Sequence, residues 1–177
     1  KPIWAVASGG AYSAAYKIAA ACDRIYVPED AEVGSIGVLW LHMDYSRRME
    51  AEGIAATFVY AGEHKIDGND LMPLESSVRA EIQQRINERY DQFVSFVSTY
   101  RPMTEEQVRA TEARFYLGSE AVRLGLADDV ASYEDARQML ASEVRRPVSV
   151  YRFDGKTHVI PSTQRNQKGR LSRRLWL

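Results

Sequence analysis

Two side chains in this sequence, Ser13 and Lys65, have surroundings that suit nucleophilic catalysis. Ser13 follows a strand-like run and the pair Gly9-Gly10, at the point where an alanine-rich helix is expected to begin. Lys65 lies in a polar loop directly after another strand-like run. A serine at the start of a helix, paired with a lysine that loses water on burial, is one known solution to peptide hydrolysis, because a neutral amine can accept the hydroxyl proton. The pair therefore predicts a serine peptidase.

Each residue also has an ordinary structural interpretation. A serine at a strand-to-helix junction is commonly a helix N-cap. A lysine in a polar loop is commonly a solvated cation, and with an ordinary pKa of about 10.4 such a lysine accepts no proton at neutral pH. Ser8 is a competing nucleophile, since it directly precedes the two glycines. Taken one at a time, these segments leave the alternatives open.

Other polar residues allow two rival sites. Ser35, between Gly34 and Gly37, could orient a lysine amine or be a plain turn serine. His64 and Asp67 permit a Ser-His-Asp arrangement with either serine. The same loop offers metal ligands, but their spacing fits neither a helical His pair nor a complete calcium loop, so we expect no metal. The candidate metal ligands are Glu63, His64, Asp67, Asn69 and Asp70.

Cys22 is the only cysteine, which excludes an internal disulfide. It lies in a helical stretch of small residues, where a structural thiol is far more common than a nucleophile.

The elements that must position these residues alternate between strand and helix. This order predicts a layered α/β domain with mostly parallel pairing. The longest helix shows one apolar face at steps of three and four, at Val78, Ile82, Ile86, Tyr90, Phe93 and Val97. Strands are expected at 3–8, 24–27, 38–41, 57–60 and 126–130, and helices at 13–22, 45–52 (capped by Asp44), 75–100, after the capping-box sequence Thr104–Gln107, after a Ser119 cap up to Gly125, and at 133–144.

Charge is unevenly distributed over the 177 residues. Residues 145–177 hold nine Lys and Arg against one Asp, which leaves 14 basic and 23 acidic residues in the rest. So acidic a body argues against nucleic acid as a partner. A short strand is conceivable at 148–151, but the polar, basic segment 161–174 predicts a disordered tail. No run is long and apolar enough for a membrane span. The chain starts without Met and enters a strand at once, so we expect a preceding segment to be missing.

Taken in order, several segments resemble the S49 peptidases, the family that includes signal peptide peptidases and phage head-maturation proteases. The resemblance covers roughly residues 1–140. The segments are Pro2-Ile3-Trp4-Ala5, Ala11-Tyr12-Ser13-Ala14-Ala15-Tyr16, Cys22-Asp23-Arg24-Ile25, Gly34-Ser35-Ile36-Gly37-Val38, Gly62-Glu63-His64-Lys65-Ile66-Asp67-Gly68-Asn69, Thr111-Glu112-Ala113-Arg114-Phe115-Tyr116-Leu117-Gly118 and Ala121-Val122-Arg123-Leu124-Gly125-Leu126-Ala127-Asp128.

The resemblance implies roles for individual residues. Aligning on Cys22-Asp23-Arg24-Ile25 places the nucleophile at Ser13 and leaves Ser8 at the end of the preceding strand. The general base then falls on Lys65 and the orienting serine on Ser35. The backbone N–H of Ala14 is the expected oxyanion donor within this chain. The family's other donor comes from a glycine-rich loop upstream, which these residues do not include.

The resemblance further implies the ClpP/crotonase-like α/β fold, a ring-shaped homo-oligomer, a polypeptide substrate and no cofactor. We expect a peptidase domain at 1–146, without its upstream strands, and a basic tail at 147–177. The residues of the motifs resemble the phage branch of the family more closely than its signal-peptide branch. That branch implies scaffold and minor capsid proteins as substrates, in the host cytoplasm or prohead. Two alternatives stay open: a signal peptide peptidase at the periplasmic face of the bacterial inner membrane, and an inactive structural component of the capsid.

Overall fold

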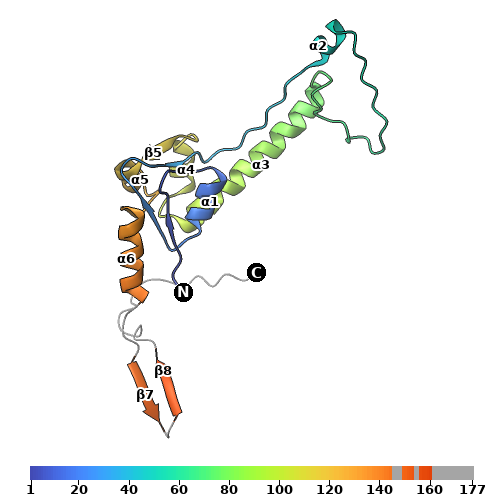
Figure 1. Ribbon diagram of the computed structural model, residues 1–177. Helices are drawn as coiled ribbons and strands as arrows, with labels where there is room; N and C mark the ends of the chain where they lie inside the picture. Colours follow the sequence, from blue (N-terminus) through green and yellow to red (C-terminus); the bar gives the residue numbers. More distant parts are fainter. Residues whose placement is uncertain (145–148, 154–155, 161–177) are drawn as a thin grey trace. The chain divides into compact units, whose positions relative to one another are not determined.

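The structure is a computed structural model that describes residues 1–144, 149–153 and 156–160, the last two ranges by their backbone alone. The chain divides into a first unit spanning Ile3–Tyr133 and a second that begins at Glu134. Figure 1 shows the order of the elements along the chain. The candidate site residues all belong to the first unit.

One three-stranded sheet lies in the first unit and is entirely parallel. It consists of β1 (Trp4–Val6), β3 (Arg24–Val27) and β6 (Asp129–Val130), with β3 in the centre. Ala5 pairs with Ile25, and Val27 pairs with Val130. The side chains of β3 from Ile25 to Val27 are buried, as a central parallel strand requires when both of its faces are covered.

A second three-stranded sheet carries the elements next to the candidate nucleophile. In it, β4 (Glu32–Gly34) pairs in parallel with β2 (Ala11–Tyr12) and antiparallel with β5 (Phe115–Leu117). Three of the four strand pairings in these two sheets are therefore parallel, which confirms the expected α/β class with mostly parallel pairing.

Four of the helices of the first unit pack around its core. They are α1 (Ala14–Ala20), the C-terminal part of α3 (Ser76–Tyr100), α4 (Glu105–Ala110) and α5 (Gly118–Leu124). The small residues of α1 let it pack closely, and Ala19 and Ala20 are buried. The largest fully buried side chains are Tyr16, Tyr26, Ile25, Ile36, Leu126, Val27, Val33, Val94, Val97 and Val108.

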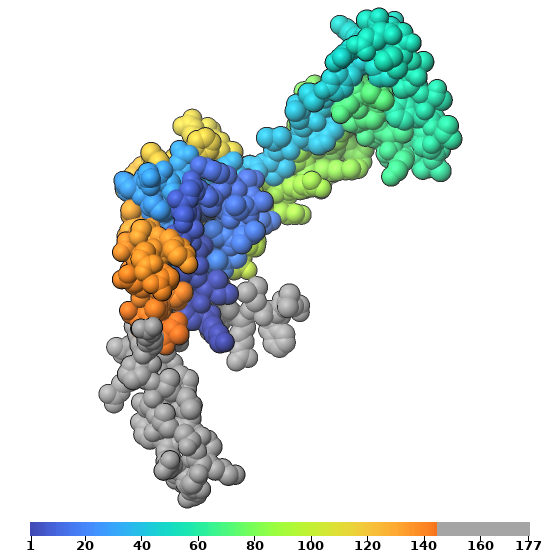
Figure 2. Space-filling model, viewed as in Figure 1, coloured from blue at the N-terminus to red at the C-terminus, as the bar shows by residue number. Residues whose placement is uncertain are grey.

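Only the C-terminal part of α3 enters this core. Phe93, Val94 and Val97 are buried, whereas Val78, Ile82 and Ile86 of the predicted apolar face are half-exposed. The N-terminal part packs instead against residues 38–75, here called the arm. The arm leaves the sheets, runs beside α3 and contains the short helix α2 (Ser46–Ala51) (Figures 1 and 2).

The strands expected at 38–41 and 57–60 are wrong, because both segments lie in the arm without regular structure. Leu39, Leu41 and Val59 have exposed fractions of 86%, 70% and 96%. Apolar and β-branched residues favour strands only where a neighbouring strand pairs with them and a face is buried. Within residues 1–144 no strand pairs with either segment.

Two of the predicted helix-end signals, the capping box and Gly125, are confirmed, and two predicted caps, Ser119 and Asp44, are wrong. Thr104 and Gln107 form the reciprocal capping box, with distances of 3.1 Å from Gln107 N to Thr104 Oγ1 and 2.8 Å from Thr104 N to Gln107 Oε1. Gly125 ends α5 in the left-handed conformation, as expected. Ser119, however, is the second residue of α5 rather than its cap, and its hydroxyl donates to Glu29. The N-cap of α2 is Tyr45 rather than the expected Asp44, although the Asp44 side chain accepts the Ser46 N–H.

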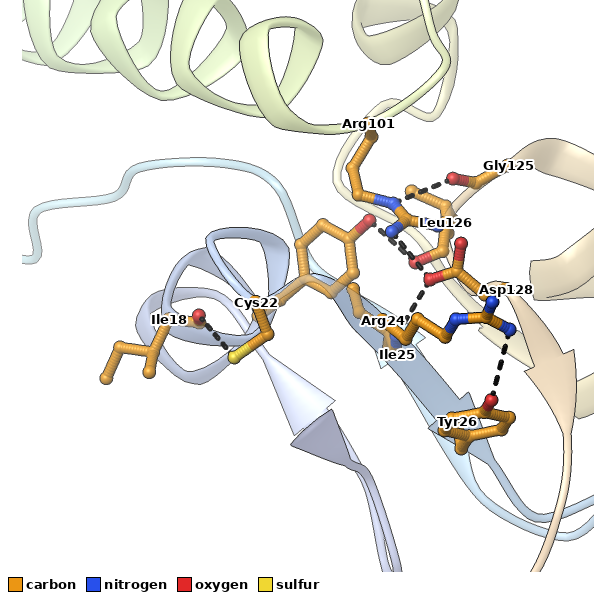
Figure 3. A network of polar contacts seen from close by, with 10 residues as sticks. Ile18, Cys22, Arg24, Ile25, Tyr26, Arg101, Gly125, Leu126 and Asp128 are labelled. Atoms are coloured by element: carbon orange, nitrogen blue, oxygen red, sulfur yellow. Dashed lines mark hydrogen bonds and ion pairs between the residues drawn. The ribbon is translucent and has the colours of Figure 1, made fainter. Parts of the chain in front are cut away.

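A buried polar network joins the end of α3 to β3 and to the turn after α5. Arg101, whose side chain is 3% exposed, donates from Nε to the Gly125 carbonyl and pairs with Asp128 at 2.8 Å (Figure 3). The same Asp128 carboxylate accepts the Ile25 N–H. The Tyr16 hydroxyl of α1 donates to the Leu126 carbonyl, and burial raises the pKa of this phenol.

The second unit contains the helix α6 (Tyr133–Val144), which matches the expected helix, and an antiparallel hairpin of β7 (Ser149–Phe153) and β8 (Lys156–Ile160). The hairpin begins where a short strand was considered, at 148–151, and extends into the segment expected to be a tail. The disordered segment predicted at 161–174 lies outside the described residues. Across the described part of the chain, no helix has the length and apolar character needed to cross a bilayer.

Replacing Tyr16 by Phe tests the contribution of the buried network. The variant keeps the ring but leaves the Leu126 carbonyl without its donor, so we expect the free energy of unfolding to fall by about 1 kcal/mol. Urea unfolding followed by circular dichroism measures the change. Tyr12→Phe is the matched control, because its hydroxyl bonds Glu32 at the surface. Equal losses in the two variants would contradict the role assigned to the buried hydroxyl.

Candidate active site

Ser13 occupies a strained turn between β2 and α1. Its backbone angles are φ 51° and ψ −116°, a region that residues with a side chain rarely enter. Ser13 is the N-cap residue of α1 by position, since its carbonyl accepts the Lys17 N–H, but its hydroxyl makes no capping hydrogen bond to the helix. A sharp, strained turn from strand to helix is the geometry that exposes a nucleophilic serine in other hydrolases.

Ser35 comes close to Ser13 through the register of the sheet. Tyr12 pairs with Gly34 in the parallel ladder, and the Ser13 N–H donates to the Gly34 carbonyl at 2.9 Å. The residues that follow these two partners are thus Ser13 and Ser35. Ser35 also has a positive φ, 54°, and its N–H donates to the Arg114 carbonyl.

Backbone strain concentrates around these serines. Within residues 1–144, the residues other than glycine with positive φ are Ser13, Ser35, Glu112 and Ala113. Three of them, all except Glu112, line one cavity of about 580 Å³. Strained residues persist where the surrounding structure holds them, and they cluster at functional sites.

The cavity is lined by the start of α1, by the segment that follows β4, by Ala113 and by α3. The described residues that line it are Ser13, Ala14, Lys17, Ser35, Gly37, Val38, Leu39, Arg89, Gln92, Phe93 and Ala113. Sequence reasoning singled out Ser13, Ala14 and Ser35 from this set. It missed Lys17, although one helical turn separates it from Ser13, and it missed Arg89, which only the packing of α3 brings to the site.

Neither of the other two candidate nucleophiles lines this cavity. Ser8 lies in an exposed bend after β1, outside any helix start. Cys22 is half-buried just beyond α1, where desolvation and the neighbouring Asp23 raise the pKa of its thiol. A raised pKa disfavours the thiolate, which agrees with the expected structural role of Cys22.

Lys65 lies at the other end of α3. It is exposed, in a turn whose neighbours His64 and Ile66 line a different cavity together with Val78 and Glu81. The cavity at Ser13 meets α3 at Arg89, Gln92 and Phe93. Since an α-helix rises 1.5 Å per residue, the contacts at Val78 and Gln92 are about 20 Å apart. Within one chain the structure therefore brings Ser13, Ser35 and Ala14 together but leaves Lys65 remote from them.

The arm holds the Lys65 loop in a defined conformation. His42 Nε2 lies 2.9 Å from the Asn69 carbonyl, and the Tyr45 N–H donates to the Asp70 carbonyl. Trp40 contacts the position of Gly68, where φ is 71°. The loop is thus fixed against residues 40–45 and the N-terminal part of α3.

His64 pairs with Asp67 in this loop, with 2.8 Å between Nδ1 and Oδ2. The hydrogen bond to Asp67, and the charges of Asp67 and Glu63, raise the pKa of the His64 imidazole. The ion pair is accordingly present at low pH and is lost as the pH rises through that raised pKa. His64, Asp67 and Glu81 have ligand atoms within 4.8 Å of one another, all at the surface. His64 and Asp67 lie in the same loop as Lys65 and are therefore remote from Ser13. The rival Ser-His-Asp triad is thus not assembled within one chain.

Gly34 lies between the strained turn at Ser13 and the strained turn at 112–113. Its carbonyl accepts the Ser13 N–H, and its Cα faces the backbone of Arg114. A Cβ at this position would lie 2.5 Å from the Arg114 carbonyl oxygen, a backbone atom that cannot swing away, and φ is 131°. We expect Gly34→Ala to lower the free energy of unfolding by about 3 kcal/mol, through overpacking and backbone strain together. Denaturant unfolding is the measurement.

Gly53→Ala is the control for Gly34→Ala, since Gly53 also has a positive φ, 68°, but no atom lies within 4 Å of its added Cβ. It should cost only the left-handed penalty of about 1 kcal/mol. Similar losses at the two glycines would show that the contact with Arg114 is unimportant.

The chain is similar to proteins of a known peptidase family. The model of Peptidase family S49 matches residues 1–146. The head-tail preconnector protein GP5 of Enterobacteria phage P21 is 33% identical over 168 residues, 95% of this chain and 34% of that protein. Capsid assembly protease C of Escherichia phage lambda is 38% identical over 136 residues, 77% of this chain and 31% of that protein. A protein of Enterococcus faecium named "Putative signal peptide peptidase SppA" is 32% identical over 147 residues, 80% of this chain and 42% of that protein.

Among solved structures, one titled as a putative enoyl-CoA hydratase from Thermobifida fusca YX in complex with CoA covers 82% of this chain and 41% of that one, at 16% identity and a TM-score of 0.33. The chain spans about a third of the length of the two phage proteins. The match of the S49 model over residues 1–146 shows that this chain belongs to peptidase family S49.

Proposed function

We propose that this chain is the catalytic part of a serine endopeptidase in which Ser13 is the nucleophile and Lys65 of a neighbouring copy is the general base. The observation that carries the proposal is the strained backbone of Ser13, which exposes an uncapped hydroxyl beside Ser35 and the first N–H groups of α1. The first N–H groups of a helix have no partner within the helix, so the Ala14 N–H is available to an oxyanion.

The reaction follows from this arrangement. The neutral amine of Lys65, oriented by the Ser35 hydroxyl, takes the proton from Ser13 as its Oγ attacks the carbonyl carbon. The carbonyl oxygen becomes an oxyanion and accepts the Ala14 N–H. When the intermediate collapses, the C–N bond breaks and the ammonium returns the proton to the leaving amine. Water, deprotonated by the same lysine, then attacks the acyl-serine ester, releasing the new carboxyl end and restoring Ser13.

The neighbouring copy enters because, within one chain, the Lys65 loop and the cavity at Ser13 adjoin α3 at contacts about 20 Å apart. Rotation of side chains cannot close such a gap, and the Lys65 loop is fixed to the arm. The arm also exposes large apolar side chains, Leu39, Leu41 and Val59 among them, which a second copy would cover. Covering the arm would also remove water from the amine, which favours the neutral form of a lysine.

We further propose that the substrates are proteins of an assembling phage head. This rests on the two phage relatives, whose names refer to head-tail connection and capsid assembly. Cleavage of signal peptides at a membrane is the second candidate, supported by the relative from Enterococcus faecium. A catalytically inactive capsid component remains as the third.

A fluorophosphonate probe applied to the full-length protein tests the nucleophile and the base. We expect label on Ser13, located by mass spectrometry of the modified peptide, and at least a hundredfold slower labelling of Lys65→Ala, because a serine without its base is a weak nucleophile. His64→Ala is the matched control in the same loop and should label normally. If instead His64→Ala alone lost labelling, the base would be the histidine. No label on any serine of the folded protein would favour the inactive component.

Mixing two inactive variants tests whether the dyad forms between copies. Ser13→Ala and Lys65→Ala are unfolded together and refolded as a mixture. If a neighbour supplies the lysine, about one quarter of the sites combine an intact serine with an intact lysine, and labelling returns to about that fraction. If both residues of the dyad came from one chain, every site would contain a substitution and the mixture would stay inactive.

A further inference from the structure

The cavity at Ser13 contains two cationic side chains that the proposed mechanism does not use. Lys17 lies one helical turn after Ser13 on α1, and Arg89 lines the cavity from α3. Ser13 and Ser35 line the same space of about 580 Å³, and no Asp or Glu is among the described residues that line it.

Lys17 is held in place by aromatic rings. Its Nζ lies 5.6 Å from the centroid of Phe93 and 5.0 Å from that of Phe96. The faces of aromatic rings attract a cation but supply no negative charge to neutralise it. The ammonium is therefore kept at the wall of the cavity, half-buried and still able to pair with an anion.

Arg89 is likewise without a carboxylate partner within residues 1–144, although acidic residues flank it on α3. Glu88 accepts a hydrogen bond from Gln84, and Asp91 pairs with Arg109 across to α4 at 2.9 Å. Both acids are thus engaged on other faces of the helix. Among the described residues, the cavity thus combines two cations that pair with no carboxylate and the apolar side chains of Val38, Leu39 and Phe93.

We propose that this cavity binds an acidic side chain of the polypeptide substrate next to the scissile bond, with Lys17 and Arg89 pairing its carboxylate. This rests on the proposed function, since the position next to Ser13 matters only if Ser13 is the nucleophile. A guanidinium binds a carboxylate through two parallel hydrogen bonds, and an ammonium adds a third donor group. Lys17 and Arg89 then determine which peptide bonds are cleaved.

The test compares matched peptides. The full-length protein first digests a mixture of proteome-derived peptides, and mass spectrometry identifies the residues beside the cleaved bonds. Two synthetic peptides that differ only by Glu or Gln at the selected position then give kcat/KM values. We expect the Glu peptide to be preferred about tenfold, the size of one charge-assisted contact. The preference should vanish in Lys17→Met together with Arg89→Gln, and Arg89→Glu should favour a peptide with Lys at that position.

Arg85→Glu is the control variant. Arg85 lies one turn before Arg89 on α3, pairs with Glu81 and does not line this cavity. Its replacement changes the net charge as much as Arg89→Glu does, so a long-range effect of charge would appear in both variants. A local carboxylate site predicts that Arg85→Glu keeps the preference for Glu.

Labelling of Ser13 by the fluorophosphonate probe is followed in every variant. Labelled Ser13 with equal cleavage of the Glu and Gln peptides would overturn this inference and leave the proposed function intact. Loss of labelling and of all cleavage in the wild-type protein would overturn both. A shifted pH profile of kcat/KM in the variants, with the Glu preference retained, would mean that the two cations act on the lysine base instead. Dissociation of the oligomer in the variants, with the preference retained, would mean that they bind an acidic surface of the neighbouring copy.

Discussion

The candidate site depends on one backbone interaction, the parallel pairing of β2 with β4 and its extension by the hydrogen bond from Ser13 N–H to the Gly34 carbonyl. This pairing ends both strands at the same level, so the two residues that follow them leave the sheet together. It also provides the support that a strained residue needs, because a φ of 51° at a serine survives only where neighbouring contacts hold the chain. On the other side of β4, the Arg114 carbonyl approaches so closely that only glycine fits at position 34. The register of β2 with β4, the strained backbone of Ser13 and the absence of a side chain at Gly34 therefore depend on one another.

The second constraint is the length of α3. Its C-terminal end is tied into the core by Phe93, Val97 and the Arg101–Asp128 pair, while its N-terminal end carries the arm. A helix resists bending, so the distance between the two functional halves is set by the number of residues between them. Ser13 and Lys65 therefore do not meet within one copy. Closed homo-oligomers bring together such different surfaces of identical chains.

Much of this could be predicted from the sequence, for reasons that differ between residues. The turn around Ser13 has strong local signals, and the capping box at Thr104 and the end of α5 at Gly125 follow from rules that involve only a few neighbouring residues. The positive φ of Ser13, Ser35 and Ala113 has no such signal, because these residue types give no hint of it. The strands predicted at 38–41 and 57–60 are wrong because strand propensity needs a pairing strand and a buried face, and the described residues supply neither to these segments. Lys17 and Arg89 were missed because their common location depends on how α1 packs against α3.

The separation of Ser13 from Lys65 affects how the catalytic activity depends on the concentration of the protein. If the site forms only between copies, a freshly synthesised subunit is a zymogen that needs no propeptide, and its activation follows mass action. Catalytic output would then rise more steeply than linearly with protein concentration and would fall on dilution. Such an enzyme is inactive as dissociated subunits and active once they associate. The length of α3 would then restrict proteolysis to the assembled oligomer.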